Sequence, residues 1–240
     1  MIHRSQKNWL AWLLPFMLMT PFQAVAGESV ILLHGMARTA RSMATMETAL
    51  SSAGYHTVNL GYPSTDYPVE VLAGKAVNES LSACPPENKI HFVTHSLGGI
   101  LVRRYLSRHE IQNLGRVVML GPPNQGSQVV DKLKDVPGFK LINGPAGRQL
   151  GTDPDSIPSQ LGPAEFEVGI IAGTRSINLF LSTLLPGQDD GKVTVENTKL
   201  EGMADHMELP ATHPFMMKNE RVIRQTIHFL KHGRFARNAD

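Results

Sequence analysis

Several features that would assign a chain to other protein classes are rare or missing in this sequence. The 240 residues include a single cysteine, Cys84, so no intrachain disulfide can form and stability must come from a packed core. Charged residues make up only 18% of the chain, with 23 basic against 21 acidic side chains and no block of like charge. This balance gives no indication of nucleic-acid binding. No His or Cys cluster has the spacing of metal ligands, so we expect no metal and no other cofactor.

Long apolar runs are also scarce, and the run near the N-terminus (residues 9–19) is interrupted by Pro15. It follows the basic residues Arg4 and Lys7 and precedes the small-residue pattern AVA, which ends at Ala26. Together these features predict a secretory signal peptide over residues 1–26. The run is shorter than the roughly 20 residues of a membrane span, although an uncleaved N-terminal membrane anchor is the alternative. We therefore expect an exported protein, periplasmic or secreted.

The remainder, residues 27–240, is expected to form a single α/β domain. Hydrophobic residues make up 42% of the chain, enough for one sizeable core, and no internal repeat is present. Strand-like apolar runs occupy residues 28–35, 89–96, 115–123, 165–174 and 206–213, and residues 55–63 read as a second strand followed by a loop. Helical patterns occupy residues 42–54, 64–84, 97–109 and 219–233. This alternation predicts a mostly parallel central sheet flanked by helices, with functional groups at the carboxyl ends of the strands.

A different kind of segment separates the fourth and fifth expected strands. Residues from about 124 to 164 are rich in Gly, Pro and Asp and show only short helical patterns. Long connections of this kind are usually functional or mobile, which predicts a cap or lid over a pocket. A plain surface excursion is the alternative.

Ser96 is the candidate nucleophile. It lies between the apolar strand IHFVT and the helical segment LGGILVRRYL, with Gly98 two residues later. A serine on such a sharp strand-to-helix turn has an exposed hydroxyl, and small neighbours two residues before and after it avoid a clash. The usual pattern is G-x-S-x-G, but here Thr94 occupies the first position, which leaves the tightness of the turn open. A serine that merely caps the helix is the alternative.

A serine nucleophile needs a base, which in turn needs an acid, both placed after later strands. His213 follows the sixth expected strand and is the first candidate for the base, with His206 as the second. Asp190, in the loop after the fifth strand, is the favoured acid, and the adjacent Asp189 is the alternative.

The oxyanion of the reaction would also need hydrogen-bond donors. One is expected from the backbone N–H of Leu97, directly after the nucleophile. The other is expected from Met36, in the loop after the first strand, where Gly35 permits close backbone approach and His34 can brace the loop.

At this stage the sequence resembles a known family. The segments VILLHGMART, FVTHSLGGILVRRYL, MLGPPNQGS, DDGKVTVENTKLEGMADH and LPATHPFMM are similar to those of lipase-like serine hydrolases of the α/β-hydrolase superfamily. Small bacterial lipases and PGAP-type ester hydrolases are the most similar groups, and the resemblance spans roughly residues 28 to 232. It implies the α/β-hydrolase fold with a cap insertion and no cofactor. Its implied site is Ser96 as nucleophile, Asp190 as acid and His213 as base, with Met36 and Leu97 at the oxyanion hole.

The expected reaction is hydrolysis of a carboxylic ester through an acyl-enzyme. Apolar residues of the cap segment favour a hydrophobic ester or lipid substrate, with transient contact to a membrane surface: Val129, Val130, Leu133, Phe139, Leu141 and Ile142. An acyltransferase would need the same residues, and a non-catalytic binding protein with this fold is a further alternative. The sequence leaves the oligomeric state open.

Overall fold

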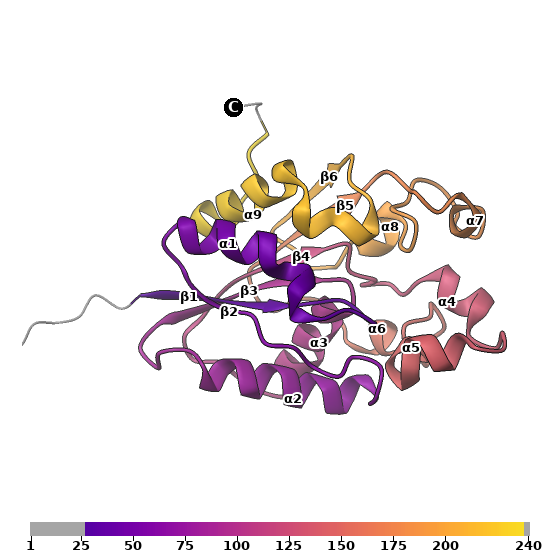
Figure 1. Cartoon of the computed structure of the whole chain (residues 1–240), viewed down its shortest axis with the longest axis horizontal. Coiled ribbons are helices and arrows are strands. Elements are labelled where there is room, and N and C mark those ends of the chain that lie inside the picture. Colours follow the sequence, from indigo (N-terminus) through magenta and orange to yellow (C-terminus); the bar gives the residue numbers. More distant parts are fainter. Residues whose placement is uncertain (1–26, 238–240) are drawn as a thin grey trace, which may run out of the picture.

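The computed structural model describes residues 27–237, and the predicted signal peptide lies outside the described residues. Six parallel strands form one sheet in the order β2-β1-β3-β4-β5-β6 (Figure 1). The strands are β1 (Glu28–Leu33), β2 (His56–Val58), β3 (Lys89–His95), β4 (Leu114–Leu120), β5 (Val168–Gly173) and β6 (Asp205–Leu209). β5 is buried along its whole length and β3 at every position after Lys89, as expected of strands covered on both faces. The parallel sheet that the alternating pattern predicted is confirmed.

Helices cover both faces of the sheet. The helices α1 (Ala44–Ser52) and α9 (Glu220–His232) pack on one face, and α2 (Val69–Ser82) and α3 (Leu97–Leu106) pack on the other (Figure 1). The hydrophobic core is accordingly divided into two clusters, one under each pair of helices. Phe92 of β3 belongs to the cluster under α2 and α3, and Phe229 of α9 belongs to the other. Both side chains are fully buried.

The closing helix α9 shows how local sequence fixes an element. Asn219 caps its first turn by accepting hydrogen bonds from the backbone N–H groups of Arg221 and Val222. Gly233 ends it in the left-handed region, with φ 70°. One face of the helix is buried: Val222, Ile223, Thr226, Phe229 and Leu230. This apolar face lies against β4, so the helix completes the layer beside α1.

The second helix starts later than its expected range, and the second strand is short and followed by a loop. The second helix begins only at Val69, because the residue before Pro68 is disfavoured in helical geometry. The second strand ends at Val58, and the following residues leave the sheet edge. There the backbone N–H of Tyr62 donates a hydrogen bond to His34 Nε2 (3.3 Å), so this stretch supports the loop after β1 instead of extending β2.

The expected cap segment contains three short helices, α4 (Gln128–Leu133), α5 (Phe139–Arg148) and α6 (Ile157–Gln160). A further excursion between β5 and β6 contains α7 (Leu179–Ser182) and α8 (Val195–Thr198). The helices α4, α5 and α7 lie beyond the carboxyl ends of the strands (Figure 1). A 3-10 helix, η1 (Ala40–Met43), precedes α1, and another, η2 (His213–Lys218), precedes α9. None of the described helices is both long and apolar enough to cross a membrane.

Candidate active site

Ser96 lies on a strained turn between β3 and α3. Its backbone has φ 52° and ψ −119°, and Ala37 is the other non-glycine residue with positive φ among residues 27–237. Strain of this kind gathers at functional sites, and Ala37 belongs to the loop that faces Ser96. The turn is tight enough that a Cβ at Gly98 would lie 2.5 Å from the carbonyl oxygen of Leu33. Ser96 occupies the N-cap position of α3, but its side chain makes no capping hydrogen bond.

Thr94, which stands where the usual pattern has glycine, is fully buried without displacing the turn. Its hydroxyl lies 3.5 Å from the carbonyl oxygen of Val118, at the limit of a hydrogen bond. A Cβ at Gly99 would be only 3.3 Å from Thr94 Oγ1. Because Gly99 has no side chain, the Thr94 side chain fits beside it.

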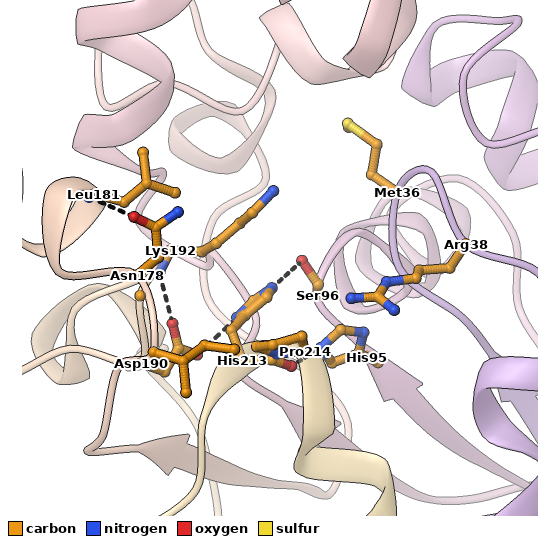
Figure 2. A pocket seen from close by; sticks show the side chains of 12 residues that line it. Met36, Arg38, His95, Ser96, Asn178, Leu181, Asp190, Lys192, His213 and Pro214 are labelled. Carbon is orange, nitrogen blue, oxygen red and sulfur yellow. Dashed lines mark hydrogen bonds and ion pairs between the residues drawn. The ribbon is translucent and has the colours of Figure 1, made fainter.

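Ser96, His213 and Asp190 form a continuous chain of hydrogen bonds (Figure 2). The Ser96 hydroxyl donates to His213 Nε2 over 3.0 Å, and His213 Nδ1–H donates to Asp190 Oδ2 over 2.7 Å. His213 is 5% exposed and Asp190 is completely buried, so water does not compete for their contact. The three side chains come from the loops after β3, β6 and β5, and the fold brings them together at one edge of the sheet.

Asp190 is held in a fixed orientation by its own loop. Its Oδ1 accepts hydrogen bonds from the backbone N–H groups of Lys192 and Val193, each 2.9 Å long. Its backbone carbonyl accepts from the His213 N–H over 2.9 Å. Gly121, with φ 55°, packs against the pair, and a Cβ there would lie 2.8 Å from Asp190 Oδ2. One carboxylate oxygen is thus satisfied by the backbone, and the other faces the imidazole.

The alternative acid and base lie elsewhere. Asp189 Oδ1 accepts hydrogen bonds from the Ser182 hydroxyl and the Gly191 N–H, both 2.7 Å long, so its side chain stabilises the turn. His206 lies within β6, and its Nε2 is 3.0 Å from Thr198 Oγ1. Neither side chain contacts Ser96 or its partners.

The loop after β1 brings Met36 beside the serine. A Cβ at Gly35 would lie 3.3 Å from Ser96 Cβ, so the backbone of this loop passes directly over the nucleophile position. Within the described chain, the N–H groups of Met36 and Leu97 donate to no acceptor. Two free amide donors next to the serine hydroxyl are what an oxyanion requires.

His34 braces this loop, as the sequence suggested. Its Nδ1–H donates to the Gly35 carbonyl over 2.8 Å, and its ring stacks on Tyr62 with centroids 4.0 Å apart. Since Nε2 accepts from the Tyr62 N–H, the imidazole is held in one neutral tautomer. Burial lowers the pKa of His34, which also favours the neutral form.

His95, beside Ser96, links two elements of the site. Its Nε2–H donates to the backbone carbonyl of His213 over 2.9 Å, which ties the end of β3 to the loop that carries the imidazole. Burial and the neighbouring His213 lower the pKa of His95 well below its usual value. No local sequence pattern predicts this contact, because it joins residues 118 positions apart.

Two cavities meet at Ser96. The larger, of about 180 Å³, includes His213, Pro214, Leu181 of α7 and its N-cap residue Asn178 in its wall (Figure 2). The smaller, of about 60 Å³, lies under the cap segment. Three residues line both cavities: Met36, Ser96 and Lys192.

Only part of the expected apolar lining is found. Val129, Val130 and Phe139 line the smaller cavity. Leu141 and Ile142 do not: they are 88% and 64% exposed on the outer side of α5. The sequence showed that they are apolar residues of the cap segment, but a helix presents only one of its faces inward. Leu133 is absent from the walls of both cavities.

Two charged residues of the site were not identified from the sequence. Arg38 and Lys192 both line the larger cavity, and Lys192 also reaches the smaller one. The sequence signal that could have identified them is proximity along the chain: Arg38 lies two residues after Met36, and Lys192 lies two residues after Asp190. In the described part of the chain, no group of three His, Cys, Asp or Glu side chains is arranged to hold a metal ion.

Solved structures of known proteins are similar to this chain, whereas comparisons of its sequence found no match. No protein-family model and no curated protein matches the chain. The mature form of the lipase BlEst2 from Bacillus licheniformis has a similar structure, with 21% identity, a TM-score of 0.66, and coverage of 85% of this chain and 92% of the lipase.

Two structures of metagenomic origin are similar as well. A carboxyl esterase has 18% identity and a TM-score of 0.63, over 79% of this chain and 65% of the esterase. A lipolytic enzyme from the LipS and LipT study has 13% identity and a TM-score of 0.62, over 86% of this chain and 95% of that enzyme. With the single parallel sheet, these similarities show that the chain has the α/β-hydrolase fold that the sequence resemblance implied.

Proposed function

We propose that the protein is a serine hydrolase that cleaves carboxylic esters through an acyl-enzyme. The observation that carries this proposal is the hydrogen-bonded series from Ser96 Oγ through His213 to the buried carboxylate of Asp190. Solved lipases and esterases of the same fold lend it support. A non-catalytic role has no comparable observation in its favour, because a binding protein has no need of such an arrangement.

In the proposed reaction, Ser96 Oγ attacks the ester carbonyl while its proton passes to His213 Nε2. The negative charge that develops on the carbonyl oxygen is stabilised by the backbone N–H groups of Met36 and Leu97. Asp190 holds the imidazole in the tautomer that accepts the proton and stabilises the imidazolium. His213 then returns the proton to the leaving alcohol, and water releases the acyl group by the same steps in reverse order.

The acyl part is proposed to be hydrophobic, because the cavity under the cap segment is lined by Val129, Val130 and Phe139. Exposed apolar side chains beside the site support transient contact with a lipid surface: Leu141 and Ile142 on α5, and Leu179 and Phe180 on α7. Export to the periplasm or medium would give access to such substrates. An acyltransferase would use the same acyl-enzyme with another acceptor in place of water.

A panel of nitrophenyl esters of increasing chain length tests the proposal. We expect the purified protein to hydrolyse short or medium chains, and Ser96→Ala to lose activity by a factor of about 10³ to 10⁶ while keeping the melting temperature. Equal hydrolysis by both proteins would contradict the assignment of the nucleophile. For the base, His213→Ala is compared with His206→Ala, and only the former should abolish activity.

A further inference from the structure

Two cations in the larger cavity have no part in the reaction described above. Arg38 and Lys192 lie on either side of Ser96, as Figure 2 shows. Both side chains are accessible from the cavity, and within residues 27–237 neither takes part in an ion pair or a side-chain hydrogen bond. The nucleophile is thus flanked by two positive charges without partners.

Some cations elsewhere on the described surface have carboxylate partners, as Lys134 has in Asp153 at 3.0 Å, and others have none. What sets Arg38 and Lys192 apart is that both line the cavity beside Ser96. In the larger cavity, Asp190 is the single carboxylate among the described lining residues, and it is completely buried and hydrogen bonded to the backbone and to His213. Burial and the charge of Arg38 lower the pKa of Lys192, partly opposed by Asp190. An anion bound between Arg38 and Lys192 would offset the repulsion between the two positive charges.

The positions of the two cavities indicate which part of an ester each receives. His213 lines the larger cavity and is absent from the walls of the smaller one. Because His213 must reach the leaving oxygen to protonate it, the alcohol part of the ester belongs in the larger cavity. The acyl chain then occupies the smaller, apolar cavity, and the alcohol lies between Arg38 and Lys192.

We propose that the substrate is an acyl ester whose alcohol part carries a carboxylate or a phosphate, bound between Arg38 and Lys192. This inference rests on the proposed ester hydrolysis. An Arg guanidinium offers paired donors that match the oxygens of either anion, and a Lys ammonium adds a second charge-assisted contact. When the tetrahedral intermediate collapses, the bond between the carbonyl carbon and the alcohol oxygen breaks. That oxygen takes the proton from His213 Nε2, and the anionic alcohol leaves with its charge unchanged.

The test compares two esters that differ by one charge, 2-nitrophenyl butyrate and 3-butyryloxy-4-nitrobenzoate. They share the acyl chain and an ortho-nitrophenol leaving group, so the carboxylate is the variable. A second pair, a monoacylglycerol and its glycerol phosphate counterpart, distinguishes a lipid headgroup from a small carboxylate as the source of the anion. For each pair the measured quantity is the ratio of kcat/KM for the anionic ester to that for the neutral ester.

We expect Arg38→Gln and Lys192→Met each to lower this ratio about tenfold in at least one pair, and Lys192→Arg to restore most of it. Arg41→Gln and Lys231→Met are matched controls, since both cations are exposed and lie outside the two cavities. Their ratios should equal that of the unmodified protein. Raising the salt concentration should lower the ratio for the unmodified protein, because accessible charges are screened.

The inference is overturned if the ratios do not change in the pocket variants, either because neither ester is affected or because neutral and anionic esters lose activity equally. The second would mean that the cations act on the oxyanion and not on the substrate. A binding measurement separates failure of this inference from failure of the hydrolase proposal. In Ser96→Ala, the anionic alcohol 3-hydroxy-4-nitrobenzoate should bind more tightly than 2-nitrophenol, and Arg38→Gln should remove the difference. If that preference holds while no ester is hydrolysed, the hydrolase proposal fails and the anion site stands.

Discussion

Replacing Asp190 with asparagine should almost abolish activity, because the two carboxylate oxygens of Asp190 have different hydrogen-bond partners. Oδ1 accepts from the N–H groups of Lys192 and Val193, whereas Oδ2 faces His213 Nδ1. In Asp190→Asn, the carbonyl oxygen must remain on the side of the two backbone donors, because an NH2 group there would face two N–H groups. The NH2 group is then directed at His213 Nδ1, which has to accept a hydrogen bond. The ring proton moves to Nε2, where it blocks acceptance of the Ser96 proton.

The wrong tautomer is known to cost a serine triad about 10⁴ in kcat, so we expect a loss of about 10³ to 10⁴. This corresponds to about 4 to 5.5 kcal/mol of transition-state stabilisation. The free energy of unfolding should change by no more than about 1 kcal/mol, because the asparagine preserves the number of hydrogen bonds. The assay is kcat with a nitrophenyl ester at neutral pH, together with urea unfolding of the same preparations.

Asp189→Asn is the matched control. Both hydrogen bonds of Asp189 go to its Oδ1, so the amide oxygen of asparagine can accept them both. We expect this variant to retain at least about a tenth of the activity, because the substitution can at most shift the turn that carries Asp190 slightly. Retention of more than a tenth of the activity in Asp190→Asn would refute the tautomer argument, and so would equal losses in the two variants.

Two further predictions concern stability. Gly98→Ala would place a Cβ 2.5 Å from the Leu33 carbonyl oxygen and should lower the free energy of unfolding by about 2 kcal/mol. Gly74→Ala, in α2 with no atom within 4 Å of the added Cβ, should raise it, and urea unfolding that showed the reverse order would contradict the packing at the turn. Burial lowers the pKa values of His34, His91 and His95 from 6.5, so the unfolded chain binds more protons than the folded chain at mildly acidic pH. Stability should be complete above about pH 6.5 and decrease as the pH falls below it, and equal unfolding free energies at about pH 7.5 and pH 5.5 would contradict this.

The sequence was sufficient for the elements whose signal is local. The buried strands around Phe92 and Ile170 are continuous apolar runs, and parallel strands in one sheet need their carboxyl ends at a common edge. That rule alone places Ser96, Asp190 and His213 near one another, because each follows a strand. The distances between their atoms depend on loop conformations such as the tight turn at Gly121, for which no local pattern exists.

Features that depend on contacts between distant residues could not be read from the sequence. The link from His95 to the His213 carbonyl is one of them, and the positions of Arg38 and Lys192 on either side of the serine are another. In the cap segment, the pattern showed that apolar residues were present but not which of them face inward. Phe139 lines the cavity while Leu141, two residues later, is 88% exposed.

The presence of two cavities at one serine has a consequence for what happens after the first half of the reaction. In the proposed reaction the acyl group stays bound to Ser96 and occupies the smaller cavity, so the next nucleophile would arrive through the larger one. Whichever molecule fills the space beside His213 at that moment receives the acyl group. Water gives a hydrolase, whereas an alcohol retained between Arg38 and Lys192 would be acylated again. The rate at which the first product leaves the cavity between Arg38 and Lys192 would therefore set how often the proposed acyl-enzyme returns to the starting ester instead of being hydrolysed.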